Sequence, residues 1–276
     1  MSQRGQDALL KELEGIRDFY QLDVKQFVSF VRERKLHIVD GFRQYAQWLE
    51  QEHEGKRYSP STINRKIAAA RNRVRYAFKR SAFADSLQKK YGMEDVLKSV
   101  KLKKIELRPA SARTVLRAEE ARTLVGKTKD GTIRLMVSFL VRTGVRVSEM
   151  LALRLDDLAK TPDGLVRVRV RGSAGKERII TMKNDLVEKV RTHFNGAVYL
   201  FEHHGRPYSR ISVTNRIKIE SLKILGREIS AKQLRHTWAA IQIKRGRAVK
   251  AVAAILGHAD PGFTARMYPD TGTPTG

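Results

Sequence analysis

The chain has 276 residues and a mass of 31.5 kDa, which is room for one large domain or two modest ones. Its 41% hydrophobic content excludes general disorder, and the lack of cysteine excludes disulfides, cysteine nucleophiles and thiolate metal sites. Lysine and arginine outnumber aspartate and glutamate by 55 to 29, for a formal net charge of +26. This excess favours a polyanionic partner, because each phosphate that a cation neutralises releases condensed counterions.

The positive charge is spread along the whole sequence. Residues 1–104 carry a net charge of +10 and residues 105–276 carry +16, so one basic tail does not account for it. No apolar run is long enough to span a membrane, and no signal-peptide core is found. We therefore expect a cytoplasmic nucleic-acid-binding protein with two basic domains and no membrane partner.

The first hundred residues predict a helical domain. Apolar residues recur every three or four positions from 19 to 31 and from 38 to 49, which is helical spacing. Ser59 before Pro60 is typical of a helix start, with serine as the cap and proline in the first turn. The helix that follows has one apolar face, and no acidic residue occurs from Arg57 to Ala84. Its cations are the expected DNA contacts, which we assign to Arg65, Lys66, Arg71, Arg73 and Arg75.

The second half predicts a mixed domain. The basic, proline-ended run from 98 to 109 indicates a linker. Helices are expected over 116–125 and over 132–143, the latter ending at Gly144. Valine and arginine alternate over 165–171, which predicts a half-buried strand, and after a glycine-rich turn the strand over 178–182 completes a hairpin. The last hundred residues return to helix, except the final eight.

The expected fold is therefore mainly α with a small antiparallel β-sheet. We place a helical DNA-binding domain at 1–104, a basic linker at 105–113 and the mixed domain at 114–276.

Three separate segments each carry residue types that are suited to phosphate chemistry. Arg146 lies where one helix ends and another begins, and helix termini favour anions. Lys232 and Arg235 are three positions apart and share a helix face. His258 is followed ten positions later by Tyr268. Such residues suit metal-free phosphoryl transfer, in which arginines hold the non-bridging oxygens, an acid protonates the leaving oxygen and a phenol serves as nucleophile.

The same segments resemble the sequence boxes of a known family. TGVRVSEMLALRLDDL, KQLRHTWAA and ILGHADPGFTARMY are similar to the boxes of the tyrosine recombinase/integrase family. SPSTINRKIAAARNRVRYAF resembles the helical core-binding domain of that family, and VLRAEEARTLV resembles the start of its catalytic domain. One box alone is weak evidence, whereas several in the right order at the right intervals are specific. The resemblance covers nearly the whole chain and implies a core-type DNA-binding domain followed by an α+β catalytic domain.

The resemblance also implies roles for individual residues. Arg146 and Arg235 match the two catalytic arginines, and Glu149 matches a supporting partner of the first. His258 matches the position that hydrogen-bonds the phosphate, and Tyr268 matches the nucleophile. Tyr268 is then expected to form a 3′-phosphotyrosyl link and release a 5′-hydroxyl, without metal, ATP or other cofactor. The partners implied are double-stranded attachment sites and further copies of this chain, as a tetramer on paired DNA.

Two positions depart from the family pattern. Lys232 stands where members usually have histidine, a variant similar to that of some archaeal virus and plasmid integrases, which indicates a mobile element as source. The hairpin position expected to hold the lysine that protonates the leaving oxygen is Ser173. Lys176, three residues later in the same turn, is the candidate for this acid.

Other interpretations stay open at this point. Lys232 either takes part in proton transfer or serves as a plain phosphate contact, and His236, Trp48 and Trp238 are expected to pack structurally. For the whole chain, the alternatives are a degenerate relative that binds DNA without cutting it, and a type IB topoisomerase or telomere resolvase. A general RNA-binding protein would not need the ordered boxes.

Overall fold

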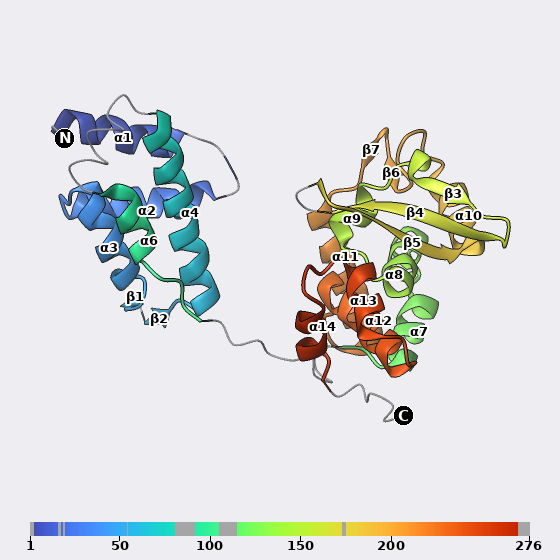
Figure 1. The fold of residues 1–276 in the computed structure, drawn as a ribbon. Helices are drawn as coiled ribbons and strands as arrows, with labels where there is room; N and C mark the ends of the chain where they lie inside the picture. Colours follow the sequence, from blue (N-terminus) through green and yellow to red (C-terminus); the bar gives the residue numbers. More distant parts are fainter. Residues whose placement is uncertain are drawn as a thin grey trace. The chain divides into compact units, whose positions relative to one another are not determined.

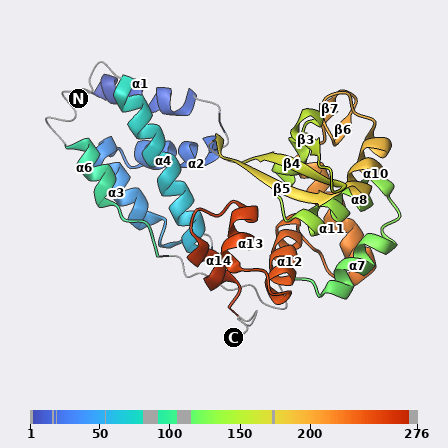
Figure 2. The same cartoon turned by 45° about the vertical axis from the view of Figure 1, so that its right-hand side comes forward.

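The computed structural model describes residues 3–15, 18, 20–53, 55–80, 92–104, 115–172 and 175–269. The chain forms two compact units, Met1–Glu106 and Leu107–Gly276, both mostly helical (Figure 1; Figure 2). None of the helices in these ranges is long and apolar enough to cross a membrane. The prediction of a mainly helical protein with small antiparallel sheets is confirmed.

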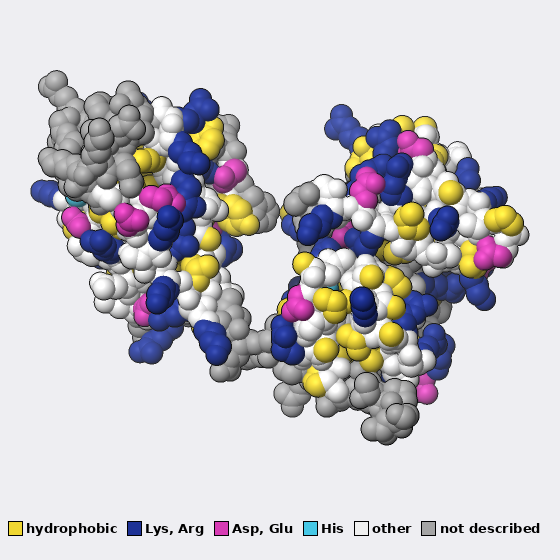
Figure 3. Space-filling view, in the orientation of Figure 1, with side chains coloured by type: hydrophobic (Ala, Val, Ile, Leu, Met, Phe, Trp, Pro, Cys, Tyr) yellow, Lys and Arg dark blue, Asp and Glu magenta, His cyan; other side chains and the backbone are white. Residues whose placement is uncertain are grey.

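The first unit is a helical bundle with one short β-ribbon. Its elements are α1 (Gln3–Gly15), α2 (Gln21–Glu33), α3 (Ile38–Trp48), β1 (Glu52–His53), β2 (Lys56–Arg57), α4 (Pro60–Arg80) and α6 (Met93–Ser99). Phe27 anchors the core, with its ring edge-on to Phe42 at 6.0 Å and to Tyr45 at 5.2 Å. Trp48 packs beside this cluster, stacked on Tyr45 at 5.7 Å. Lysine and arginine side chains on the surface of this unit are interspersed with acidic ones (Figure 3).

The start of the basic run from 98 to 109, which the sequence suggested as a linker, belongs to the first unit. The first two residues of the run complete α6, and the segment that follows is held to α4 by an amide side chain. Asn64 donates from Nδ2 to the carbonyl of Lys103 at 2.9 Å and accepts from the Lys103 N–H at 2.7 Å. Residues 100–103 therefore belong with the helices of the first unit, and the proposed linker at 105–113 lies outside the described residues.

The second unit combines helices with a three-stranded sheet. Its elements are α7 (Ala118–Lys127), α8 (Gly131–Thr143), α9 (Val147–Leu151), a 3-10 turn (Leu155–Asp157), β3 (Leu158–Lys160), β4 (Leu165–Arg171), β5 (Glu177–Lys183), α10 (Asn184–Phe194), β6 (Glu202–His203), β7 (Arg206–Pro207), α11 (Arg210–Leu225), α12 (Ala231–Lys244), α13 (Val249–Leu256) and α14 (Pro261–Met267).

The hairpin predicted from alternating residues is present. Strands pair in the antiparallel order β3-β4-β5, with Val168 opposite Ile180. Valines of β4 point into the core and its arginines point out, as period-two patterning requires. The β5 strand runs one residue further at each end than expected. Of the final eight residues predicted to be non-helical, Pro269 lies in a turn, and those from 270 on lie outside the described residues.

A glycine at the end of α8 lies between two segments that carry predicted site residues. Gly144 has φ of +68°, which ends the helix in the left-handed region. A Cβ here would lie only 2.5 Å from the Trp238 ring, so the position requires glycine for space as well. Trp238 in α12 also donates from Nε1 to the carbonyl of Arg142 at 2.9 Å. These contacts confirm Trp238 as a packing residue and fix α12 against the segment that carries Arg146.

Candidate active site

Arg146 stands at the start of α9 and is tied to Glu149. Its backbone N–H donates to one carboxylate oxygen at 2.8 Å, and Nη1 donates to the other at 2.7 Å. The glutamate side chain is 4% exposed, whereas that of Arg146 is 44% exposed. The buried carboxylate therefore holds an accessible guanidinium in place.

Arg235 is the buried counterpart on α12. It donates to the carbonyls of Gly144 at 2.9 Å and Leu256 at 2.6 Å, so it joins the ends of α8 and α13. Burial, followed by repulsion from Arg146, lowers its pKa to about 10. The guanidinium therefore stays charged at neutral pH.

Glu149 is shared by three arginines. Arg178 donates to both of its oxygens, at 3.0 and 2.7 Å, and Nη1 of Arg235 lies 3.9 Å away. Burial opposes ionisation of Glu149, but the hydrogen bonds from Arg178 and Arg146 lower its pKa to about 2. Three guanidiniums thus surround one carboxylate. We call Arg146, Arg178 and Arg235 with Glu149 the arginine cluster.

Arg178 was missed by the sequence analysis. It occupies a position on β5 whose side chain shares the face of the buried Ile180 and Met182. A charged residue on the core-facing side of a strand was the available signal, because such a charge needs a partner. Arg178 also donates from Nε to the carbonyl of Ile255 at 2.6 Å, which joins the hairpin to α13.

His258 follows the left-handed Gly257 at the end of α13. Its Nε2 lies 3.3 Å from Nη2 of Arg235 and its Nδ1 lies 2.8 Å from Oγ1 of Thr264. Since arginine only donates, Nε2 accepts and Nδ1 carries the proton. Burial, then repulsion from Arg235 and Arg146, lowers the pKa of His258 to about 4, so the ring is neutral at neutral pH.

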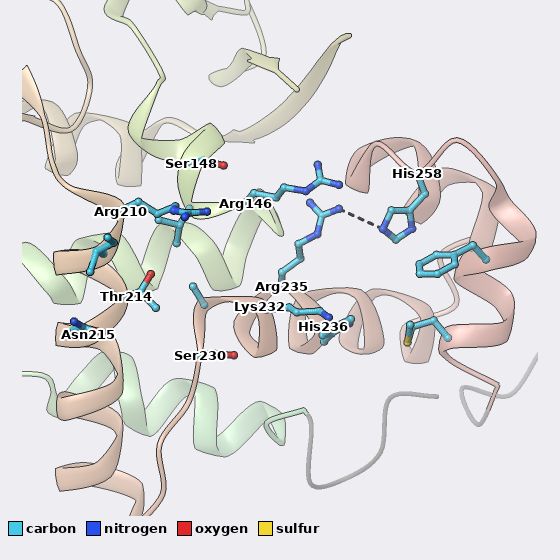
Figure 4. A pocket seen from close by; sticks show the side chains of 15 residues that line it. Arg146, Ser148, Arg210, Thr214, Asn215, Ser230, Lys232, Arg235, His236 and His258 are labelled. Atoms are coloured by element: carbon cyan, nitrogen blue, oxygen red, sulfur yellow. Dashed lines mark hydrogen bonds between the residues drawn. The ribbon is translucent and has the colours of Figure 1, made fainter. Parts of the chain in front are cut away.

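Four of the predicted catalytic residues line one cleft of about 630 Å³. They are Arg146, Lys232, Arg235 and His258, and Figure 4 shows them together. Arg210, Thr214 and Asn215 of α11 and His236 of α12 contribute further polar side chains. The cleft therefore offers several hydrogen-bond donors to an anion.

Lys176 does not line this cleft. It is exposed at the turn of the β4–β5 hairpin, where its carbonyl accepts from the N–H of Gly172 at 2.7 Å. Ser173, at the position where the family usually has the lysine, lies outside the described residues.

Tyr268 is buried behind the cleft. It follows α14, is 6% exposed, and packs in a cluster with Trp238, Val252 and Leu256. Its hydroxyl lies 2.5 Å from Nδ1 of His236, a residue expected only to pack. No local pattern signals this contact, because the two residues are 32 positions apart.

Both members of this pair are neutral at neutral pH. Burial raises the pKa of Tyr268 to about 12. Burial, then repulsion from Lys232 and Arg235, lowers the pKa of His236 to about 4. The phenol is therefore the donor and Nδ1 of the imidazole is the acceptor.

Three cations of α4 pair with acidic side chains that lie outside this helix. Arg65 and Lys66 both pair with Asp23 of α2, and Lys66 also donates to Gln26 at 2.6 Å. Arg73 pairs with Asp18 and donates to the carbonyl of Leu13 at 3.3 Å.

The two remaining cations are also engaged within the unit. Arg75 donates to Glu94 at 2.7 and 3.1 Å, and Arg71 donates to the carbonyl of Val100. Lys66 and Arg73 are buried, so direct contact with DNA requires their ion pairs to open. DNA contact by these five residues stays a prediction.

Metal-ligating side chains do not gather in the described part of the chain. No group of three or more histidine, aspartate or glutamate side chains there could hold an ion. The cations described above are the groups available to bind an anionic substrate.

The sequence matches relatives of known type. Residues 114–272 match the model of the phage integrase family. Tyrosine recombinase XerD of Staphylococcus haemolyticus (strain JCSC1435) is 27% identical over 262 residues, which cover 87% of this chain and 83% of the relative. Tyrosine recombinase XerD of Staphylococcus aureus (strain Mu50) is 30% identical over 141 residues, or 46% of each chain.

Solved structures share the fold. A lambda integrase tetramer bound to a Holliday junction aligns with a TM-score of 0.59 and 17% identity, covering 98% of this chain and 78% of that one. The XerH site-specific recombinase bound to its difH substrate aligns with a TM-score of 0.54 and 13% identity, covering 96% and 90%. On the family match and the XerD relatives, the chain belongs to the phage integrase family and is a tyrosine site-specific recombinase.

Proposed function

We propose that this recombinase cuts and rejoins duplex DNA through a 3′-phosphotyrosyl link at Tyr268, with no metal and no ATP. One observation carries the proposal. Arg146, Lys232, Arg235 and His258 line a single cleft, and a fifth lining residue, His236, contacts the hydroxyl of Tyr268. The cleft thus combines anion-binding cations with an adjacent nucleophile.

The arginine cluster supplies the electrostatic part of the mechanism. A phosphorane-like transition state carries more charge on its non-bridging oxygens than the phosphodiester does, and fixed cations stabilise that difference. Glu149 neutralises only part of the charge of three arginines. The remaining positive charge, together with Lys232, is available to the scissile phosphate.

Bond formation and cleavage then balance without an outside reactant. The Tyr268 hydroxyl gives up its proton to a base as its oxygen bonds to phosphorus, the bond from phosphorus to the 5′-oxygen breaks, and that oxygen takes a proton from an acid. Lys176 is the proposed proton donor, brought to the cleft by movement of its hairpin turn, and Lys232 binds the phosphate. Rejoining runs the same steps in reverse on a partner strand.

The proposed partners are duplex attachment sites and other copies of this chain. Neighbours in the fold comparison were solved as a dimer on a core site and as a tetramer on a Holliday junction. We extend to this chain a tetramer on two paired duplexes, with contacts from Arg65, Lys66, Arg71, Arg73 and Arg75 of α4. The Lys232 variant favours a mobile element, of archaeal type, acting in the host cytoplasm.

A covalent-capture experiment tests the proposal and does not require the target sequence to be known in advance. Nicked duplexes of random sequence are incubated with the protein in EDTA, and DNA that survives denaturing washes is sequenced. We expect an enriched sequence linked to a peptide containing Tyr268, and no capture by Tyr268→Phe, which should still bind the selected duplex. Capture by Tyr268→Phe, or none by the wild type on DNA that it binds, would contradict the proposal.

The degenerate-binder alternative has one observation in its favour. Tyr268 is 6% exposed and does not line the cleft, so its side chain must move to reach a phosphate. The second outcome of the capture experiment, binding without any adduct, would select this alternative.

A further inference from the structure

In the hydrogen bond between His236 and Tyr268, the phenol is the donor and the imidazole is the acceptor. Phenol oxygen and Nδ1 are 2.5 Å apart, and the two rings are tilted by 57° with centroids 5.8 Å apart. An imidazole nitrogen that accepts a hydrogen bond from a hydroxyl is placed to take its proton. We propose that His236 is the proton acceptor for Tyr268 during DNA cleavage, an assignment that rests on the proposed function.

The other cleft residues are unsuited to this step. Arg146, Arg235 and the ammonium form of Lys232 carry donors and no acceptor. His258 uses Nε2 for Arg235 and Nδ1 for Thr264. Among the ionisable side chains described around the cleft, His236 is the one with a ring nitrogen at the phenol.

His236 lies between the cleft, where the substrate is expected to bind, and the proposed nucleophile Tyr268. His236 lies one helical turn after Lys232 on α12, and both line the cleft. Tyr268 contacts the same imidazole from behind, within the apolar cluster at the end of α14. A phosphate bound at Lys232 is therefore close to the imidazole that accepts the hydrogen bond of the phenol.

Charge around His236 links the proton transfer to substrate arrival. The groups that face it are Lys232 and Arg235 on its own helix, Tyr268 after α14 and His258 after α13. Lys232 and Arg235 lower its pKa, so a phosphate that compensates their charge raises it. Before DNA binds, the phenol keeps its proton and the nucleophile stays inactive.

The step conserves atoms and charge. As the Tyr268 oxygen bonds to phosphorus, its proton passes to Nδ1 and the ring becomes imidazolium. When the 5′-hydroxyl of a partner strand attacks the phosphotyrosine, the phenolate leaves and recovers that proton.

The principal test replaces His236 by asparagine. His236→Asn retains an oxygen acceptor near the position of Nδ1 but cannot take a proton. On the duplex selected by covalent capture, we expect single-turnover adduct formation to fall about 100-fold or more, with unchanged DNA affinity. The matched control is His193→Asn, a histidine on α10 that hydrogen-bonds Thr132 and does not line the cleft; its rate should equal that of the wild type.

Two further readouts separate proton acceptance from positioning. In His236→Gly, added imidazole should restore adduct formation, and substituted imidazoles should restore it in the order of their basicity. In the wild type, cleavage should be independent of pH between about 7 and 9, whereas a nucleophile prepared by hydroxide would gain about tenfold per pH unit. The second readout needs no variant.

The outcomes are distinct from those of the proposed function. A His236→Asn rate close to that of the wild type, or a tenfold rise per pH unit in the wild type, would overturn the role of His236 alone. Loss of the adduct in Tyr268→Phe would still support Tyr268 as nucleophile. If the wild type forms no adduct, the proposed function fails first.

Discussion

Cations gather both on α4 and around the cleft, but they are neutralised differently. On α4, four cations (Arg65, Lys66, Arg73 and Arg75) pair with three acidic side chains outside that helix, which are Asp18, Asp23 and Glu94. Around the cleft, Glu149 alone is shared by three arginines. The arginines around the cleft therefore share fewer acidic partners than the cations of α4 do.

The cations of α4 and those around the cleft also differ in how exposed their side chains are. Lys66 is buried with its partner Asp23, and Arg73 is buried although its partner Asp18 is 44% exposed, so both charges stabilise contacts within the first unit. Arg146 is 44% exposed while its carboxylate partner is buried, so its charge faces the cleft. Four predictions test this contrast.

The largest effect is expected from removing the shared carboxylate. Glu149→Gln leaves three guanidiniums close together without a counter-charge, and we expect a loss of about 3 kcal/mol in the free energy of unfolding together with loss of cleavage. Denaturant titration and covalent capture would measure both.

Asp157→Asn is the matched control. Asp157 is a fully buried carboxylate that binds Arg169 at 3.1 Å and Arg171 at 2.6 Å, away from the cleft. It should lower stability while folded protein still cleaves. Equal loss of cleavage in both variants would show that stability, not the arginine cluster, limits the reaction.

Acid should destabilise the second unit through its neutral histidines. His236 and His258 have pKa values of about 4, below the usual 6.5, so between these values the unfolded state binds more protons. Stability is then fully present above pH 6.5 and falls as the pH drops towards 4. Glu149, with its pKa lowered from 4.5 to about 2, adds a further loss below pH 4.5.

Denaturation midpoints measured at steps of pH would check this. His236→Asn and His258→Gln should each flatten the curve between pH 6.5 and 4. A slope unchanged by either substitution would show that folding does not lower the pKa values of these two rings.

A smaller effect is expected when Arg178 is replaced by lysine, which keeps the positive charge but has no planar guanidinium. Arg178→Lys cannot bind both oxygens of Glu149 and the Ile255 carbonyl together, so we expect cleavage to fall about tenfold with DNA affinity unchanged. Arg171→Lys on the neighbouring strand is the control. Single-turnover rates and equilibrium binding, measured separately, would show whether the loss lies in the chemical step.

The smallest effect concerns α4. The side chain of Arg65 is 47% exposed and that of Arg73 is 5% exposed. Arg65→Ala should weaken DNA binding a few-fold and lower the salt slope by about one, whereas Arg73→Ala should reduce stability and leave that slope unchanged. A lower slope in Arg73→Ala would mean that its ion pair opens on DNA.

Much of the fold followed from local sequence. Alternating valine and arginine predicted β4 because a strand turns successive side chains to opposite faces. Ser59 and Pro60 marked the start of α4, and Gly144 marked the end of α8, because caps depend on a few adjacent residues. The resemblance of the sequence boxes to those of the family implied Arg146, Lys232, Arg235 and His258 as site residues, and the structure brings these four to one cleft.

Contacts between distant residues were decided only by the tertiary structure. The absence of acidic residues near α4 suggested free cations, yet Asp23 reaches Lys66 across 43 positions. Arg178 hydrogen-bonds Glu149, which is 29 positions away in the sequence, and His236 hydrogen-bonds Tyr268, which is 32 positions away. Ion pairs and hydrogen bonds depend on separations of a few ångströms, which packing sets and sequence spacing does not. The sequence therefore determined which residues could act, and the packing of α12, α13 and α14 decided which of them meet.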